Sequence, residues 1–572
     1  MQSDTRPILV LGAGINGSAI ARELVLNRLP VVLVETEDIA FGTTAYSSRL
    51  IHGGLRYLEY GEFSLVRESL AERTRLLRLA PQFVQPLELF IPVENYWRGF
   101  LSAAAKFLHW PARLAAATPP RGAWLVRIGL WMYDTYARDP TLPKRATHHL
   151  NSPGVPAVNP RRYVSLCSYY DAQVRFPERF TLALLEDARR VAAENRTRFE
   201  VFTHHRAELS GKTVKVKRTQ GGNETGIATT FEPAAIINAT GAWVDSTLAR
   251  LGVDSKPLIG GTKGSHFITS VPRLRELLGG KAIYAEAADG RPVFILPFGK
   301  ATLVGTTDLP FTGDPATAVS TSDELQYLLA TANGILPDAR LTAEDIDLHY
   351  CGVRPLPHVD ATTPGAITRR HWMQEHPGVS PPLFSVIGGK LTTCRSLAEE
   401  SAAKVLGRLG LPVVGNSEDR MLPGAEAFPR EPAARQREWE RLGKRFGLPA
   451  ESIERITALV GTQAIPILSS LPDTGAGGNQ TVEFLSGTLL PKSFAAWVIE
   501  HEWVETLDDL VERRLMLVFD RELSEACLRE LAELLVAAGK LEATNIDAAV
   551  EQTTARLQKH FGKRLHSLDQ IQ

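Results

Sequence analysis

The sequence predicts an α/β Rossmann-like dinucleotide-binding domain, interleaved with an antiparallel β-rich domain and followed by an all-α C-terminal domain. Three observations support this fold class. Residues 8–35 have the order strand, glycine loop, helix, strand, acid. Residues 256–352 contain short alternating apolar runs separated by Gly, Pro and Asp turns. Residues 430–572 have helical periodicity throughout, after a Pro- and Gly-containing linker at 410–428.

These patterns suggest domain boundaries along the chain. We expect residues 1–93 to begin the nucleotide-binding domain, 94–150 to be an insertion with an amphipathic helix, and 151–255 to continue the domain with additional β pieces. Residues 256–352 should form the substrate domain, 353–410 the return to the nucleotide-binding domain, and 430–572 the helical C-terminal domain.

The composition narrows the classes of function. Lys+Arg and Asp+Glu both number 64, so no overall field attracts nucleic acid, and any anion site must be local. The four cysteines lie far apart without a CxxC pair, which argues against a disulfide framework or a metal site and fits a reducing compartment. A strand begins by Ile8, leaving no room for a signal peptide, and no window of about 20 residues lacks charge. We therefore expect a cytoplasmic protein without a spanning helix.

The first element contains a dinucleotide fingerprint. Gly12 should allow the tight turn, Gly14 the approach of a pyrophosphate, and Gly17 the close packing of helix and strand. Ile15 and Asn16 open the helix, whose N-terminus favours an anion. Glu35 ends the second strand, where it can accept hydrogen bonds from a ribose diol and would repel a 2′-phosphate. The sequence therefore predicts a dinucleotide without a 2′-phosphate.

Later motifs select a family. The run Ser47-Ser48-Arg49-Leu50-Ile51-His52-Gly53-Gly54-Leu55-Arg56-Tyr57-Leu58-Glu59 resembles the FAD-embracing loop of FAD-dependent glycerol-3-phosphate dehydrogenases. An apolar strand ending in Ala239-Thr240-Gly241 is a common companion of the fingerprint in large flavoproteins and favours FAD over NAD, and Gly388-Gly389-Lys390-Leu391-Thr392 is a second glycine-rich loop before a helix. Further motifs resemble the glycerol-3-phosphate dehydrogenase family, several of them in the same order: Lys263-Gly264-Ser265-His266, Gly305-Thr306-Thr307-Asp308, Cys351-Gly352-Val353-Arg354-Pro355-Leu356, Ala366-Ile367-Thr368-Arg369 and the His501-Glu502-Trp503 to Arg513-Arg514 segment. The chain departs from the pattern at Arg49, where the family has Lys, and at Cys351, where it has Ser.

The resemblance implies FAD as the cofactor and an FAD-binding fold. Together with the fingerprint it predicts a set of cofactor-binding residues: Gly12, Gly14, Ile15, Asn16, Gly17, Glu35, Thr43, Thr44, Ser47, Ser48, Leu50, His52, Gly53, Gly54, Gly241, Trp243, Gly389, Lys390, Leu391 and Thr392. His52 could instead shape the loop.

The resemblance further implies oxidation of sn-glycerol 3-phosphate to dihydroxyacetone phosphate, with hydride transfer to FAD and electrons passed to a membrane quinone. Such a reaction needs a base near neutral pH, for which His266 is the candidate, although a lone His is more often a satisfied core residue. A phosphate dianion needs arginines. We expect Arg56, Arg354, Lys390 and His266 to be catalytic, and Arg56, Tyr57, His266, Thr307, Arg354 and Arg369 to bind the substrate.

Residues 97–113 are amphipathic in a way that the resemblance does not explain. On a helical wheel Trp97, Phe100 and Phe107 share one face and the cations share the other, as in an interfacial membrane helix. A helix packed on its own protein, or a contact in a homodimer, is the equal alternative. With a quinone as acceptor, the first interpretation predicts peripheral binding to the inner face of the membrane.

Two other functions fit the same motifs. One is a flavin oxidase of the same fold that uses oxygen or acts on another small hydroxy or amine substrate. The other is a non-catalytic flavin-binding sensor whose helical domain engages a partner protein.

Overall fold

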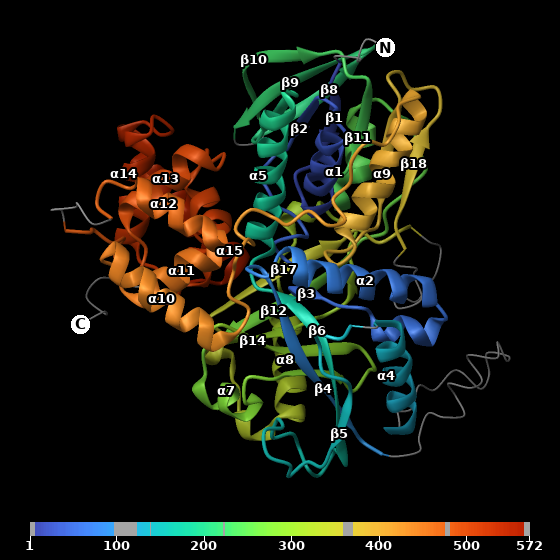
Figure 1. Cartoon of the computed structure of the whole chain (residues 1–572), viewed down its shortest axis with the longest axis vertical. Helices are drawn as coiled ribbons and strands as arrows, with labels where there is room; N and C mark the ends of the chain where they lie inside the picture. Colours follow the sequence, from blue (N-terminus) through green and yellow to red (C-terminus); the bar gives the residue numbers. More distant parts are fainter. Residues whose placement is uncertain are drawn as a thin grey trace.

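The computed structural model describes residues 6–95, 123–137, 139–220, 223–358, 370–474 and 481–565 (Figure 1). The expected amphipathic helix at 97–113 lies outside the described residues, as does Arg369. Two large sheets and a helical C-terminal region account for most of the described chain, which is the fold class that the sequence predicts.

The first sheet has six strands in the order β18-β19-β11-β1-β2-β7. Its strands are β1 (Ile8–Leu11), β2 (Val31–Val34), β7 (Phe199–Phe202), β11 (Ala235–Asn238), β18 (Trp372–His376) and β19 (Leu383–Ile387). All neighbours are parallel except β18, which runs antiparallel to β19. Helices α1 (Ile15–Leu26), α5 (Pro177–Asn195) and α9 (Cys394–Leu409) pack together, and their apolar side chains share one core with the sheet. A parallel sheet buried in this way explains the unbroken apolar runs of its strands.

The second sheet is a ten-stranded assembly that runs β16-β12-β15-β14-β13-β4-β6-β3, with β17 added beside β12 and β5 beside β6. Its strands are β3 (Leu50–Ile51), β4 (Val84–Val93), β5 (Ala146–His148), β6 (Ser165–Val174), β12 (Thr262–Thr269), β13 (Ala282–Glu286), β14 (Pro292–Phe298), β15 (Ala301–Gly305), β16 (Leu309–Pro310) and β17 (Leu348–Arg354). The sheet thus takes β3, β4, β5 and β6 from outside residues 256–352. Helices α7 (Pro272–Leu278) and α8 (Ser322–Ile335) contribute to the core on one of its faces.

Smaller elements complete the α/β part. A three-stranded sheet contains β8 (His205–Ser210), β9 (Thr213–Gln220) and β10 (Asn223–Phe231). The 3-10 helix η1 (Leu55–Tyr60), α2 (Phe63–Leu79) and α4 (Ala123–Ala137) pack against one another, and α6 (Val244–Arg250) follows β11. None of the helices in the described ranges is long and apolar enough to cross a membrane.

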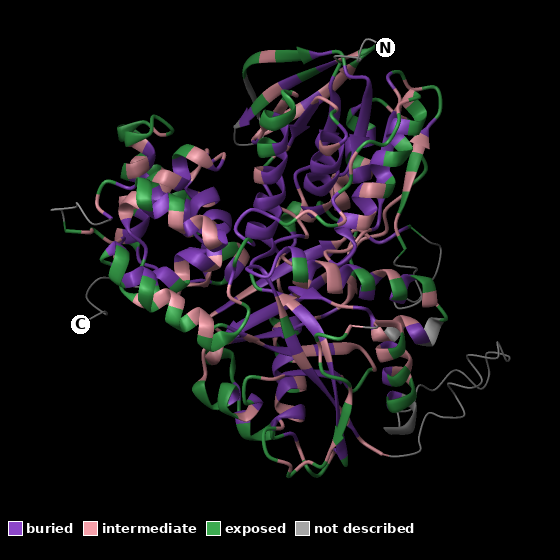
Figure 2. Cartoon of the chain, viewed as in Figure 1, coloured by how far each residue is buried: buried purple, intermediate pink, exposed green. Residues whose placement is uncertain are grey.

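The C-terminal region is helical and lies beside the two sheets (Figure 1). It contains α10 (Pro432–Phe446), α11 (Ala450–Val460), α12 (Ala464–Ser470), α13 (Lys492–His501), a π-helical turn at Asp509–Arg514, α14 (Glu525–Ala537) and α15 (Ile546–Phe561). Its apolar side chains are buried against each other and against the second sheet, so purple dominates the interior in Figure 2.

Buried ion pairs fasten this helical region to the α/β part. Arg513 and Arg514 both donate to the carboxylate of Asp38, at 2.6 Å and 2.7 Å, and all three side chains are 3% exposed or less. Arg179 of α5 donates to Glu502 through both terminal nitrogens, at 2.6 Å and 2.8 Å. Because a buried charge left without its partner is strongly unfavourable, these pairs fix the position of the helical region.

Candidate functional site

A cavity of about 1390 Å³ runs between the two sheets. It starts at the glycine loop after β1 and extends to the loop between β19 and α9. Of the residues predicted to bind a cofactor, most line its wall: Gly12, Gly14, Ile15, Asn16, Glu35, Thr43, Thr44, Ser47, Ser48, Leu50, His52, Gly54, Gly241, Trp243, Gly389, Lys390, Leu391 and Thr392. Segments from both ends of the chain therefore contribute to one elongated site.

The glycine loop has the geometry that the fingerprint predicts. Gly12 has a φ of +100°, and a Cβ there would lie 2.8 Å from the carbonyl oxygen of Ala239. At Gly17 a Cβ would lie 1.9 Å from the carbonyl oxygen of Gly12, so Gly17 serves packing and does not line the cavity. The backbone N–H of Ile15 donates to Oγ1 of Thr44 at 3.0 Å, which fixes the approach to the N-terminus of α1.

Glu35 is held at the end of β2 by backbone donors. The N–H groups of Ala13 and Glu37 donate to its carboxylate at 2.7 Å and 3.0 Å. Burial raises the pKa of Glu35, although the two backbone hydrogen bonds oppose the shift. The carboxylate faces the cavity wall one strand away from the glycine loop, where a ribose diol is expected.

Two loops that are distant in sequence meet at the other end of the cavity. The N–H of His52 donates to Oγ1 of Thr392 at 3.1 Å, and the Thr392 hydroxyl donates to the carbonyl of His52 at 3.3 Å. Nζ of Lys390 lies 4.0 Å from the centre of the Tyr57 ring. This end of the cavity therefore combines a cation, an aromatic ring and a permissive glycine backbone.

Arg354 extends from the end of β17 to the cavity wall. Its Nη1 donates to Asp308 at 3.0 Å, and its Nη2 donates to Oγ1 of Thr306 at 2.8 Å and to the carbonyl of Thr307 at 3.1 Å. The side chain keeps 20% of its surface exposed. A guanidinium fixed in this way on the cavity wall suits an anion bound in the cavity.

Some predicted site residues lie elsewhere. Gly53, Thr307 and His266 do not line the cavity. Thr307 is buried behind Arg354, where its hydroxyl donates to Glu324 at 2.8 Å and accepts from the N–H of Ser265 at 2.8 Å. Thr307 is therefore not on the cavity surface, and it contributes by holding Arg354 through its backbone carbonyl. Arg56 belongs to η1, but its side chain lies outside the described part of the structure, as does the whole of Arg369.

His266 is 2% exposed and lies behind the cavity wall. Its Nε2 is 2.9 Å from Oγ of Ser48, and its ring stacks on Tyr350 with 4.9 Å between centroids. Burial, followed by the charges of Arg354 and Arg49, holds the pKa of His266 well below its ordinary value. Among the predicted residues of this region, Ser48 and His52 reach the cavity and His266 does not.

Asp171 is a residue of the site that the sequence motifs did not predict. This buried residue of β6 lines the cavity, accepts from the N–H of Gly53 at 3.2 Å and from the hydroxyl of Tyr133 at 2.5 Å, and pairs with Arg73. The Gly53 N–H also donates to the Tyr133 hydroxyl at 2.9 Å. The unbroken run Tyr169-Tyr170-Asp171, an acid inside an apolar strand, was the available signal.

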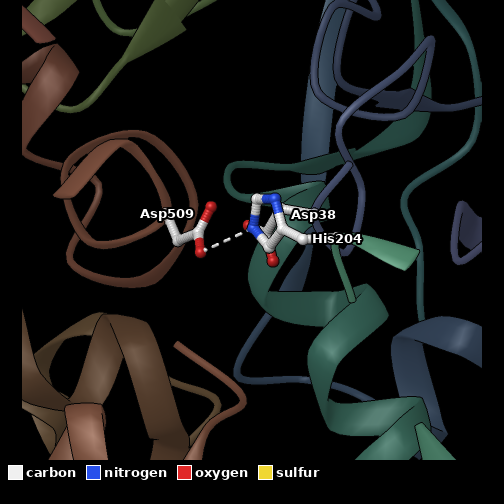
Figure 3. A group of neighbouring side chains, drawn as sticks. All are labelled: Asp38, His204 and Asp509. Carbon is white, nitrogen blue, oxygen red and sulfur yellow. Dashed lines mark hydrogen bonds and ion pairs between the residues drawn. The ribbon is translucent and has the colours of Figure 1, made fainter. Parts of the chain in front are cut away.

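Two groups of potential metal-binding side chains occur among the described residues, and none of their members lines the cavity: Asp38, His204 and Asp509, and Glu68, His371 and Glu400. In the first group, shown in Figure 3, a hydrogen bond of 3.1 Å joins His204 to Asp509. Arginines already neutralise the carboxylates of Asp38 and Asp509. The first group is therefore an ionic contact between domains.

The chain is similar in sequence and in fold to known flavin-dependent enzymes. The family model for an FAD dependent oxidoreductase matches residues 7–395. A protein of Synechocystis named glycerol-3-phosphate dehydrogenase is 34% identical over 90% of this chain and 89% of its own length. A Brucella abortus protein named D-erythritol 1-phosphate dehydrogenase is 30% identical over 90% and 94%. The glycerol-3-phosphate dehydrogenase from Bacillus halodurans, solved with FAD, has the same fold, with a TM-score of 0.67 at 20% identity over 98% of this chain and 96% of that one.

The chain belongs to the family of FAD-dependent oxidoreductases. Within it, the relatives place the chain in the glycerol-3-phosphate dehydrogenase family, which the motifs between residues 47 and 395 resemble.

The residues present fit FAD. The cavity is continuous from the anion-favouring N-terminus of α1 and the Glu35 carboxylate to the second glycine loop, where Gly388 and Gly389 have φ values of +74° and +102°. Ile15, Asn16, Glu35 and Thr44 would hold the ADP half, and the 388–392 loop with Lys390 would face the flavin. FAD, when bound, supplies an acceptor for a hydride.

Proposed function

We propose that this enzyme oxidises sn-glycerol 3-phosphate to dihydroxyacetone phosphate, with the hydride passing to FAD and the electrons then to a membrane quinone. The observation that carries the proposal is the position of Arg354, a fixed guanidinium on the wall of the same cavity that holds the flavin-side loop. A substrate phosphate bound there would bring the adjacent secondary alcohol toward Lys390 and Tyr57. The names of the relatives support this substrate class.

The charges of the site suit the reaction. Arg354 would bind the phosphate, with Arg56 and Arg369 as further donors from motifs that resemble the family. Lys390 would stabilise negative charge on the reacting oxygen and on the reduced cofactor. The closed loops around His52 and Thr392 would keep water away from the hydride.

An anaerobic reduction experiment tests the substrate. The purified flavoprotein is mixed with glycerol 3-phosphate, and the flavin absorbance is followed. We expect rapid bleaching in the wild type, and a loss of about 10²-fold or more in kcat/KM for Arg354→Ala, since a buried charged hydrogen bond is lost. Arg273→Ala removes an exposed arginine of α7 away from the cavity and serves as the control. The proposal would be overturned if dithionite reduced the flavin but glycerol 3-phosphate did not.

A second candidate substrate is D-erythritol 1-phosphate, on which the Brucella relative acts by its name. Both compounds carry a phosphate that Arg354 can bind, so Arg354→Ala does not separate them. Parallel reduction by the two phosphates and by phosphate-free glycerol does. A higher kcat/KM for the tetritol phosphate would replace the first candidate, and equal rates with glycerol would remove the phosphate requirement.

We further propose that α4 contributes to a peripheral membrane contact through which the quinone is reached. Two apolar side chains project from this helix, Ile128 at 43% and Trp131 at 55% exposure, beside the exposed Arg127. An exposed tryptophan next to a cation suits a lipid interface. The segment 97–113, with its aromatic and cationic faces, precedes this helix in the chain.

Flotation with anionic lipid vesicles tests the contact. Ile128→Ser/Trp131→Ser should release the protein from vesicles while leaving flavin reduction intact. Trp372→Ser is the matched control, since Trp372 is 40% exposed on β18 at the edge of the other sheet. Binding that survives the double change, or that never occurs in the wild type, would assign α4 to another role, such as contact within a homodimer.

A further inference from the structure

The hydroxyl of Ser48 stands between His266 and the cavity. Ser48 lines the cavity, whereas His266 is 2% exposed and does not. Oγ of Ser48 and Nε2 of His266 are 2.9 Å apart, which is hydrogen-bonding distance. The Ser48 hydroxyl therefore connects the cavity to the buried imidazole.

The imidazole is fixed in this position. Its ring stacks on Tyr350, with 4.9 Å between centroids and 21° between planes. The Tyr350 hydroxyl donates to the carbonyl of Ser47 at 2.9 Å, so the residue before Ser48 is bonded to β17, the strand that carries Tyr350. Opposite His266 stands Gly305, where a Cβ would lie 2.1 Å from the imidazole Cδ2. The imidazole therefore packs between the Tyr350 ring and the backbone of Gly305, which has no Cβ to displace it.

The charges around His266 set when it can take a proton. The charged or titratable groups facing it are Arg354 and Tyr350 from β17 and Arg49 from the loop that carries Ser48. Arg49 is paired with Glu178 through two hydrogen bonds of 2.6 Å and 3.0 Å, and Arg354 is paired with Asp308 at 3.0 Å. The Arg354 side chain is 20% exposed and that of Arg49 only 1%, so an anion in the cavity would meet Arg354. A phosphate dianion on Arg354 would offset that charge and make His266 more basic. The base would then be activated when substrate is bound.

We propose that Ser48 is a catalytic residue that relays the proton of the substrate alcohol to Nε2 of His266. As the substrate C–H bond breaks and its electron pair leaves as hydride to FAD, the O–H bond breaks and its electron pair forms the C=O bond. That proton goes to Oγ of Ser48, and the proton of the Ser48 hydroxyl goes to His266, which becomes an imidazolium. The relay requires the neutral tautomer with the proton on Nδ1. This inference rests on the proposed function and assigns its base.

The reductive half-reaction tests the relay. Ser48→Ala should slow anaerobic flavin reduction by about 10²- to 10⁴-fold, the usual range for a lost proton-transfer group. Ser48→Thr keeps a hydroxyl and should restore the rate to within about tenfold of wild type. Ser270→Ala, which removes a hydroxyl just after the same strand β12 and outside the cavity, is the control.

A second measurement separates a relay from a cofactor contact. Apoprotein of wild type and Ser48→Ala should bind FAD with equal affinity, followed by quenching of flavin fluorescence, and should unfold at the same temperature. A fall in FAD affinity that parallels the fall in rate would make Ser48 a cofactor-binding residue and overturn the relay. Ser48→Ala that is reduced as fast as wild type would overturn it as well.

Histidine NMR tests the relay without turnover. With ¹⁵N-labelled histidine, the signal assigned by its loss in His266→Gln should show the Nδ1–H tautomer, and inorganic phosphate should raise its pKa. The Nε2–H tautomer would exclude proton transfer from Ser48. If glycerol 3-phosphate does not reduce the wild type, the proposed function fails, while the tautomer still decides whether Ser48 can pass a proton to His266.

Discussion

Nε2 of His204 lies 3.1 Å from Oδ2 of Asp509, so a histidine after β7 is hydrogen-bonded to a carboxylate in the helical C-terminal region (Figure 3). Asp509 is completely buried, and its carboxylate also accepts from the N–H groups of Glu505 and Thr506. Asp38, which Arg513 and Arg514 neutralise, belongs to the same cluster. One compact group of charges therefore joins the two parts of the molecule.

The His204–Asp509 pair predicts a loss of stability at alkaline pH. Burial by itself lowers the pKa of His204, but the hydrogen bond and charge of Asp509, with the charge of Asp38, raise it above its ordinary value of 6.5. The stabilisation is thus fully present below pH 6.5 and is lost as the pH rises through the folded-state pKa. We expect His204→Gln to cost about 1.5–3 kcal/mol at pH 6 and less at pH 9. Thermal unfolding at both pH values measures this, with the exposed His149→Gln as control. An equal loss at both pH values would contradict the charged pair.

Replacement of Asp38 should destabilise the protein more than replacement of His204. Asp38→Asn leaves Arg513 and Arg514 buried without their shared charge partner, which should cost about 3–5 kcal/mol and loosen the helical region first. Chemical denaturation and limited proteolysis between residues 410 and 430 would show it. Asp419→Asn is the control: the exposed carboxylate of Asp419 forms an ion pair with Arg78 at the surface, and its loss should leave stability close to that of the wild type. Similar losses in both variants would mean that the buried cluster is not special.

Glu35 predicts the contribution of one carboxylate to cofactor binding. Glu35→Gln should weaken FAD binding to the apoprotein by about 10- to 100-fold, since a charge-assisted hydrogen bond to the ribose contributes roughly 1.5–3 kcal/mol. Titration of apoprotein with FAD measures the change. Glu232→Gln, an exposed residue before β11, should bind as wild type does. Unchanged affinity in Glu35→Gln would place the ribose elsewhere.

Lys390 predicts a catalytic effect that leaves the fold unchanged. Lys390→Met should keep the apolar stem over Tyr57 but remove the charge, and should slow flavin reduction by about 10²- to 10³-fold. The flavin reduction potential should also fall, because the negative charge of the reduced flavin loses a nearby cation. Dye-linked reduction measures the potential. A normal potential together with a normal rate would remove Lys390 from the reaction.

Features that depend on neighbouring residues could be predicted from the sequence. The turn at Gly12, the packing at Gly17 and the position of Glu35 at the end of β2 follow from short-range steric rules, and the structure has all three. The alternating strands and the helical C-terminal region follow from periodicity in the same way. Resemblance to one family added residues that line the cavity, such as Ser48, Thr392 and Lys390.

Features that depend on burial and on contacts between distant segments could not be predicted from the sequence. No pattern in Lys263-Gly264-Ser265-His266 indicates that His266 faces Ser48 from behind the wall, because that depends on Tyr350 and Gly305. Likewise the pairing of Asp38 with two arginines some 475 positions later cannot be read from either segment alone. The similarity of the His501 to Arg514 segment marked the right residues without revealing their partner.

The hydrogen bonds between His52 and Thr392 have a consequence for synthesis of the chain. These residues are 340 positions apart. A ribosome that adds about 5–20 residues per second needs roughly 17–70 s to cover that distance. Throughout that interval the nascent fingerprint strand lacks the loop that completes the flavin end of the cavity. We therefore expect FAD to be captured late in translation or after release, and the full-length protein made in a riboflavin-starved cell to be degraded by proteases.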